Sequence, residues 1–352
     1  MKQPFRALLL ALAALSVVEL TSSYFLYRYY SIHGEHFQPK GFATYFILDK
    51  VLSKMIAGRH PLKQTTDNGP LFSPSPDFGY VMNSGEYEIT ETFGEHVHKF
   101  HLGVDQSRRR ITSYAPVQAF RRIFLTGDSA VFGWGLNDQE TIGWLLQERL
   151  MSYEVINMSA TGYSTVNALE QLRIEFPIVN TNDIVILPYH PVSNDFNVLP
   201  QERLTLLSQG YEAALGEPNL LSQGIASFGA MDQNNAFEIR KIRLSCGENY
   251  APDCVRPKLS EAESQRVTEG AFDQIISSIA GRLVIAFLEG PDDDPVIRHL
   301  KMRGLTIVDL RTSADEQELD DVMPTNTHSG PFRHHHLFVR LVRGLHQASL
   351  IE

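Results

Sequence analysis

Residues 121–134 read RRIFLTGDSAVFGW and contain the clearest change from strand to loop in the chain. The apolar run at 123–125 is bounded by turn-forming residues, which is typical of a buried strand. Gly133 and Gly135 do not suit a continuing strand, so we expect Ser129 where the strand gives way to a loop or a helix start. Ligands of open α/β sheets bind at this end of the strands. Ser129 is therefore a candidate nucleophile if a base reaches it, and the alternative is a capping serine in a tight turn.

Two later stretches place polar residues after strand-like runs in the same way. Residues 157–164 read NMSATGYS and follow an apolar pair, and residues 183–195 read DIVILPYHPVSND. Near the C-terminus, a histidine lies in the stretch NTHSGPFRHHH. A serine, a glycine, an asparagine and a histidine therefore follow one another along the chain: Ser129, Gly162, Asn194 and His328.

This order of residues resembles the SGNH family, also called the GDSL esterases and lipases. The segments GDSAVFGWGLNDQET and INMSATGYST, with the Ser-Asn-Asp step at 193–195, are similar to the family's motifs. The resemblance is strong over roughly residues 115–200 and weaker over 280–345. It leaves the N-terminal third of the chain and its middle unexplained.

The resemblance implies a role for each residue of the series. Ser129 is expected to be the nucleophile, and His328 the base that takes its proton. The backbone N–H groups of Ser129 and Gly162 and the side-chain amide of Asn194 are expected to form the oxyanion hole.

The acid of this site departs from the family pattern. Family members usually carry an aspartate two or three residues before the histidine, where this sequence has Asn326 and Thr325. An asparagine can orient an imidazole ring, as in Cys-His-Asn sites, but it supports the charged ring less well. Asp321 is a second candidate if the chain loops back. We therefore expect either Asn326 or Asp321 to orient His328.

From residue 121 onward, strand-like and helix-like segments alternate. The strand-like segments are 123–125, 154–157, 184–188, 283–287 and 305–310, and the helix-like segments are 140–151, 165–176, 261–280, 295–302 and 331–346. This alternation predicts a parallel sheet with helices on both faces. Together with the resemblance, it implies a three-layer α/β fold on a doubly wound, flavodoxin-like sheet of five parallel strands.

The first 30 residues are expected to be a signal anchor. Lys2 and Arg6 precede a mostly apolar stretch from 7 to 27, interrupted by Glu19, which is long enough to span a bilayer. The small residues that a cleaved signal peptide needs at its cut are poorly represented. The basic residues before the stretch predict a cytoplasmic N-terminus and a periplasmic or extracellular main domain.

Residues 31–115 are predicted to form a juxtamembrane, β-rich addition before the main domain at 116–350. Strands are expected at EYEITET, HVHKFHLGV and RRRITSY. The second contains His96, His98 and His101, which could mark a metal site or a half-exposed strand. We favour the strand, because no Cys, Asp or Glu pattern completes a zinc site. The sequence predicts neither a metal nor a cofactor.

An extra stretch at 196–258 interrupts the main domain directly after the Asn-Asp step. It contains a helix-like segment at 201–215 and a hairpin-like pair around 232–235, and its position predicts a wall or lid over the site. Cys246 and Cys254, the two cysteines of the chain, lie within it. Outside the cytoplasm they are expected to form a disulfide, and the alternative is two unpaired buried thiols.

The composition and the candidate site together limit the possible functions of the protein. A net charge of −10 and a pI near 5.7 argue against a nucleic-acid partner. The first possible function is an extracytoplasmic ester hydrolase that acts on an acylated small molecule, lipid or polysaccharide. The second is an O-acyltransferase that uses the same site on polysaccharide hydroxyls, and the third is a catalytically silent binding or assembly module. The Ser-Gly-Asn-His order favours the first two, whereas the missing acid favours the third.

Overall fold

The computed structural model describes residues 63–352 except 94–95, 176–177, 216–223, 248–253, 313–320 and 324–325. The chain divides into two compact units. One consists of Gln64–Thr90, Lys99–Asp320 and His328–Glu352, and the other includes the described parts of Glu91–His98 and Asp321–Thr327. The predicted anchor at residues 1–30 lies outside the described residues. Within the described part of the chain, no helix is both long and apolar enough to cross a membrane.

The larger unit is built on a five-stranded parallel sheet with the strand order β12-β11-β8-β6-β7. Its strands are β6 (Arg121–Leu125), β7 (Tyr153–Asn157), β8 (Ile184–Tyr189), β11 (Arg282–Phe287) and β12 (Thr306–Asp309). Numbered along the chain, this is the 2-1-3-4-5 order of flavodoxin-like sheets. The predicted sheet of five parallel strands is confirmed.

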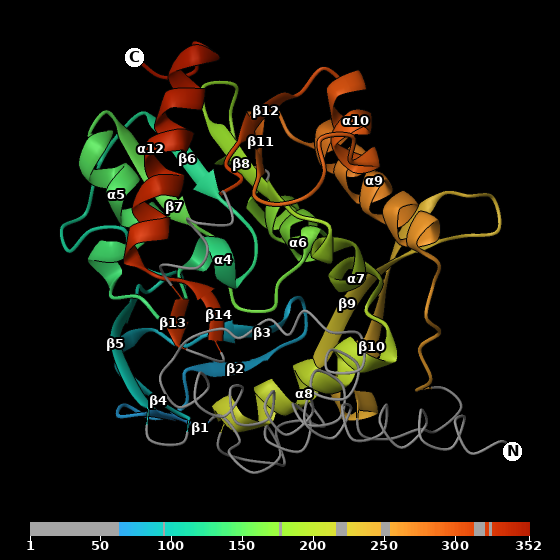
Figure 1. Cartoon of the computed structure of the whole chain (residues 1–352), viewed down its shortest axis with the longest axis horizontal. Coiled ribbons are helices and arrows are strands. Elements are labelled where there is room, and N and C mark those ends of the chain that lie inside the picture. The colour runs from blue at the N-terminus through green and yellow to red at the C-terminus, as the bar shows by residue number, and fades with distance from the viewer. Residues whose placement is uncertain are drawn as a thin grey trace, which may run out of the picture. The chain divides into compact units, whose positions relative to one another are not determined.

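Helices cover both faces of this sheet (Figure 1). One face carries α5 (Ile142–Arg149) and α12 (Pro331–Gln347), and the other carries α6 (Thr165–Glu175), α9 (Glu261–Ser278) and α10 (Pro295–Met302). Within β6, Ile123 and Leu125 belong to the first of these two cores and Phe124 to the second. Successive side chains of a strand point to opposite faces, so a strand buried on both faces is apolar throughout.

From residue 63 onward, where the structure describes the chain, five strands precede the main sheet: β1 (Lys63–Thr66), β2 (Phe72–Ser75), β3 (Gly79–Met82), β4 (Gly85–Phe93) and β5 (His96–Val104). Strands β1, β4 and β5 form one sheet, and β2 pairs with β3 as an antiparallel hairpin. The further strand predicted at 108–114 is wrong. Arg108 adopts a left-handed backbone with φ 63°, and Arg110 forms only isolated bridges while burying its side chain.

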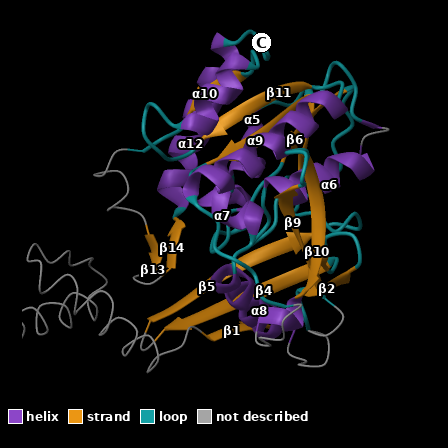
Figure 2. Ribbon diagram, turned by 90° about the vertical axis from the view of Figure 1, so that its right-hand side faces the viewer, coloured by secondary structure: helices purple, strands orange, loops and turns teal. Residues whose placement is uncertain are grey.

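The predicted insertion has secondary structure of its own. It contains α8 (Gln201–Leu215), β9 (Ile225–Met231), β10 (Phe237–Arg243) and the 3-10 helix η5 (Leu244–Gly247). The hairpin turns at Asp232, whose Oδ1 accepts the N–H of Asn234 (2.7 Å) and of Ala236 (2.8 Å). The β9–β10 pair packs against α6 and α9 (Figure 2), and β9 also contacts β3. A disulfide joins Cys246 to Cys254.

A separate hydrophobic core joins this insertion to the strands that precede the main sheet. It contains Tyr80 of β3, Leu204 of α8 and Phe228 of β9. Trp134 and Tyr163, from the segments that follow β6 and β7, belong to the same core. The insertion and the N-terminal strands therefore pack around the carboxyl ends of two strands of the main sheet.

Candidate active site

Ser129 is the first residue of α4 (Ser129–Phe132), a single helical turn that follows β6. Asp128 caps this turn, because its Oδ1 accepts the N–H of Ala130 at 2.9 Å. Gly127 has a φ of +121°, and a Cβ at this position would lie 2.2 Å from Cγ of Pro188 in β8. Only glycine allows such a close approach. The Gly-Asp-Ser sequence therefore suits a tight turn that presents the serine at the carboxyl end of the sheet.

The hydroxyl of Ser129 meets an imidazole. Ser129 Oγ lies 2.8 Å from Nε2 of His328, a half-buried residue of β14 (Asn326–Ser329). Gly330 and Pro331 follow, and Pro331 begins α12 as expected of a proline in a first helical turn. An unprotonated Nε2 at this distance can accept the hydroxyl proton. The nucleophile and the base expected from the sequence thus lie in hydrogen-bond contact.

The orienting partner of His328 stays a prediction. Asp321 begins β13 (Asp321–Met323) and Asn326 begins β14. The side chains of both residues lie outside the described part of the structure. The structure therefore does not test which of the two orients the imidazole.

The loop that carries Gly162 is held next to the nucleophile turn. The N–H of Ala160 donates to the carbonyl of Gly127 at 3.0 Å. Gly162 has a φ of +79°, and a Cβ here would lie 2.7 Å from Oη of Tyr80. The hydroxyl of Tyr80 donates to the carbonyl of Thr161. The β2–β3 hairpin therefore packs on this loop, and the role of Gly162 as an oxyanion donor stays a prediction.

Asn194 lies in α7 (Val192–Val198), and its amide points to a buried tyrosine. Its Nδ2 donates to Oη of Tyr189 at 3.4 Å, and the Tyr189 hydroxyl in turn donates to Asp294 at 3.2 Å. A contact of 3.4 Å is a long hydrogen bond. This contact holds the Asn194 side chain against the buried Tyr189. The part of Asn194 in an oxyanion hole stays a prediction.

The sequence analysis did not identify His190, which lies directly after β8. Its Nε2 is 2.7 Å from Oδ2 of Asp128, the residue before the nucleophile. Burial opposes the ionisation of Asp128, but the hydrogen bonds from His190 and the Ala130 N–H and the charges of His190 and His328 outweigh it, so the pKa of the carboxyl is lowered. The available signal was a histidine at the carboxyl end of a predicted parallel strand, where site residues gather.

A buried histidine ties three helices together next to the nucleophile. His334 of α12 accepts the N–H of Ile142, the first residue of α5, at 3.3 Å, and it also bonds the backbone of Ala130 in α4. Burial, together with the charges of Arg110 and Arg333, lowers the pKa of His334 to about 3. The ring is therefore neutral near pH 7, and His334 has a packing role rather than a surface one.

Arg110 fastens the segment that follows α4. Its guanidinium donates to the carbonyls of Phe132 (3.0 Å), Gly133 (2.6 Å) and Leu136 (2.5 Å). Its Nε donates to Asp138 at 2.9 Å, and both side chains are fully buried. Burial lowers the pKa of the guanidinium, and the Asp138 carboxylate opposes that shift. One arginine thus fixes the position at which the nucleophile helix ends.

One histidine of β5, His101, lies in an acidic cluster of the described part of the chain. His101 lies between Glu86 and Asp138, each with an oxygen 3.1 Å from a ring nitrogen. Asp138 already accepts hydrogen bonds from the Gly103 N–H and from Arg110. A guanidinium at this carboxylate disfavours a second cation. The side chain of His96 lies outside the described residues.

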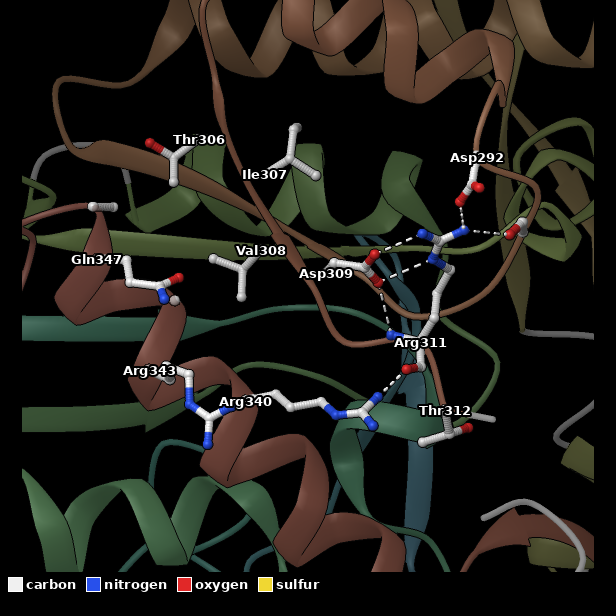
Figure 3. A pocket seen from close by; sticks show the side chains of 13 residues that line it. Asp292, Thr306, Ile307, Val308, Asp309, Arg311, Thr312, Arg340, Arg343 and Gln347 are labelled. Atoms are coloured by element: carbon white, nitrogen blue, oxygen red, sulfur yellow. Dashed lines mark hydrogen bonds and ion pairs between the residues drawn. The ribbon is translucent and has the colours of Figure 1, made fainter. Parts of the chain in front are cut away.

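A polar groove of about 930 Å³ lies along β12 and α12 (Figure 3). Arg311 in this groove pairs with Asp309 (2.6 Å) and with Asp292 (2.7 Å). Arg340 donates to the carbonyl of Arg311, so this side of the groove is tied together by its own charges. Neither Ser129 nor its imidazole partner lines the groove, so we assign it no part in the chemistry.

The fold and the site together define an α/β protein with a serine–histidine pair at the carboxyl end of a parallel sheet. The sequence matches no protein-family model and no curated protein significantly. Among solved structures, the chain is similar to TesA, with 13% identity, a TM-score of 0.37, and 64% of this chain and 97% of TesA covered.

Two further structures are similar at the same level. One is a lipolytic protein of the G-D-S-L family from Veillonella parvula, with 11% identity, a TM-score of 0.38, and 63% of this chain and 97% of that chain covered. The other is Axe2, an acetylxylan esterase from Geobacillus stearothermophilus, with 11% identity, a TM-score of 0.34, and 66% and 96% covered. At such low similarity, the function of the chain is argued from its own residues.

Proposed function

We propose that this protein is a serine ester hydrolase of the SGNH type. The observation that carries the proposal is the 2.8 Å contact between Ser129 Oγ and His328 Nε2 at the carboxyl end of β6. A serine hydroxyl is a weak nucleophile unless a base takes its proton. The capped turn that begins with Ser129 and the strand β14 that carries His328 supply that arrangement.

The reaction proceeds in two halves. His328 Nε2 accepts the proton as Ser129 Oγ bonds to the ester carbonyl carbon. The oxyanion that forms is stabilised by the backbone N–H groups of Ser129 and Gly162 and by the side-chain amide of Asn194. The tetrahedral intermediate collapses, and the imidazolium gives its proton to the departing alkoxide. A water molecule then attacks the acyl-serine with His328 again as base, which releases the carboxylic acid and restores the hydroxyl.

The substrate class is an acylated small molecule, lipid or polysaccharide on the far side of a membrane. The apolar stretch at 7–27 supports a single anchoring span with a cytoplasmic N-terminus. The disulfide between Cys246 and Cys254 supports an oxidising compartment. A reporter that is active only after export, fused to the C-terminus, is expected to be active. Activity of a cytoplasm-only reporter at the same position would contradict this placement.

The direct test is turnover of a generic acetyl ester by purified protein. Ser129→Ala is expected to lower kcat by about 10⁴-fold or more, because the proposed reaction passes through an acyl group on Ser129 Oγ. Ser277→Ala is the matched control, since Ser277 lies exposed on α9 and its hydroxyl donates to the carbonyl of Gln274 in the same helix. Equal turnover by wild type and Ser129→Ala would contradict the proposal.

Product analysis separates the alternatives. Free acetate is expected as the product, also when a polysaccharide with free hydroxyls is present. Transfer of the acetyl group to that polysaccharide would assign acyl transfer to the same site. Absence of turnover in the wild type on a series of activated esters would favour a silent binding module.

A further inference from the structure

His190 and Asp128 form a close pair immediately beside the proposed nucleophile. The distance between His190 Nε2 and Asp128 Oδ2 is 2.7 Å, and the two side chains are 13% and 11% exposed. Asp128 precedes Ser129 in the sequence, whereas His190 enters from the end of β8, the neighbouring strand. An ionised carboxylate is only an acceptor, so His190 is the donor in this bond.

The pair completes the cap of the nucleophile helix. Asp128 Oδ1 accepts the Ala130 N–H, and Oδ2 accepts His190, so both oxygens of a buried carboxylate are engaged. Helix α4 contains only Ser129–Phe132, and so short a turn depends on its cap rather than on its own hydrogen bonds. The direction of the Ser129 side chain is set at this first helical position. Loss of His190 would leave a buried oxygen without its partner and loosen the cap.

We propose that His190 is a positioning residue for the nucleophile, which acts by holding Asp128 so that Ser129 Oγ stays directed at His328. This inference rests on the proposed ester hydrolase function and adds a fourth side chain to its site. His190 acts through Asp128 and takes no part in bond making.

The pair also sets the charge next to the base. The titratable side chains that face Asp128 are His190, from the end of β8, and His328, from β14. The hydrogen bond and charge of His190 help to lower the pKa of Asp128, against the effect of burial. Without His190, burial raises that pKa, and Asp128 becomes protonated at a higher pH. A protonated Asp128 no longer accepts both hydrogen bonds, so the labelling rate without His190 should fall further behind wild type as the pH is lowered.

The chain offers a matched control in His299→Ala. Nε2 of His299 in α10 lies 3.0 Å from Oδ1 of Asp273 in α9, which is the same kind of pair in a different part of the fold. Neither residue contacts the nucleophile turn in any recorded hydrogen bond or ion pair of the described residues. The His299→Ala variant therefore shows the effect of losing a histidine–aspartate hydrogen bond that lies away from the nucleophile turn.

The experiment measures the second-order rate of labelling by a fluorophosphonate across pH, with melting temperatures alongside. His190→Ala is expected to label about 10- to 100-fold more slowly than wild type, the usual effect of a misplaced reacting group, and to fall further behind wild type as the pH is lowered. His190→Gln should recover most of the rate at each pH, because its amide can donate from the position of Nε2. His299→Ala should label as wild type does.

The outcomes separate this inference from the proposed function. If wild type is not labelled, the hydrolase function fails and the role of His190 falls with it. If wild type is labelled and His190→Ala keeps both its rate and its pH profile, only the inference is overturned. If His190→Ala does not fold, the test rests on His190→Gln. The hydrogen-bond role would be overturned if His190→Gln folds but labels as slowly as was expected of His190→Ala.

Discussion

The residues around Ser129 are held by partners that come from four different parts of the chain. His328 contacts the hydroxyl, His190 holds the preceding Asp128, and His334 bonds the backbone that follows. Arg110 holds the carbonyls at the end of the same turn. A nucleophile fixed on so many sides loses little freedom when it reacts, which is the physical basis of preorganisation.

The partner that orients His328 can be assigned by two substitutions. If Asn326 orients the ring, Asn326→Asp should keep or raise activity, because a carboxylate also stabilises the imidazolium. If Asp321 does so, Asp321→Asn should lower kcat by orders of magnitude, whereas Asn326→Asp adds a second carboxylate that repels the first. We would measure kcat/KM of both variants on one activated ester. Changes below about twofold in both, or ~0.4 kcal/mol, would contradict both assignments.

His334 predicts an acid-sensitive stability. Its folded pKa of about 3 lies below the ordinary value of 6.5, so the unfolded chain binds a proton that the folded chain excludes. The free energy of unfolding should therefore fall as pH drops below about 6.5 toward 3, by at most ~1.4 kcal/mol per pH unit from this residue. Denaturant titrations of His334→Gln should show a shallower slope. The exposed neighbour His335→Gln is the control, and an unchanged slope in His334→Gln would contradict the prediction.

At the level of secondary structure, the main sheet could be predicted because its inner strands, β6, β8 and β11, contribute apolar side chains to the cores on both faces. The run at 123–125 is apolar at every position for that reason, and Pro295 and Pro331 mark the starts of α10 and α12. The strand expected at 108–114 could not be corrected from sequence, since the burial of Arg110 depends on carbonyls more than twenty residues away.

Part of the candidate site could likewise be predicted from the sequence, and part could not. Ser129 could be proposed because it follows a strand-to-turn junction, and His328 because the Ser-Gly-Asn-His order resembles the SGNH family. The role of His190 could not be predicted, because it depends on a contact with Asp128, 62 positions earlier in the chain. The sequence indicates only that His190 follows a predicted strand.

Arg110 links two elements, and its removal should be costly. Arg110→Met leaves Asp138 buried without its cation and frees the carbonyls after α4, so the free energy of unfolding should fall by about 3–5 kcal/mol. Arg266→Met on the exposed face of α9 should change it by less than about 0.5 kcal/mol. Urea denaturation of both variants tests this, and a similar small effect for the two would show that the buried pair does not hold the segment.

At the scale of the whole molecule, one hydrophobic core is built from segments far apart in sequence. The N-terminal strands, the insertion and the loops after β6 and β7 share one core. The disulfide closes the end of this insertion, with a separation of 8 residues between Cys246 and Cys254. Because both cysteines are buried in that core, the insertion is part of the folded domain rather than an appendage.

Reduction of this disulfide should destabilise the protein moderately. A closed loop of this length restricts the unfolded chain by about 2–3 kcal/mol in the chain-entropy model. A reducing agent should therefore lower the melting temperature of wild type. The Cys246→Ala, Cys254→Ala double variant should melt lower to begin with and should not respond to the reductant. An equal response of both proteins would contradict a structural role for the bond.

The central claim is that Ser129 is the nucleophile, and mass mapping of a trapped adduct tests it most directly. Wild-type protein would be treated with a fluorophosphonate, digested and analysed by tandem mass spectrometry. The account predicts one phosphonylated serine, Ser129, in the GDSAVFGW segment, and no adduct on Ser129 in a His328→Ala variant under the same conditions. An adduct on another serine of the wild type, or undiminished labelling of Ser129 without His328, would contradict it.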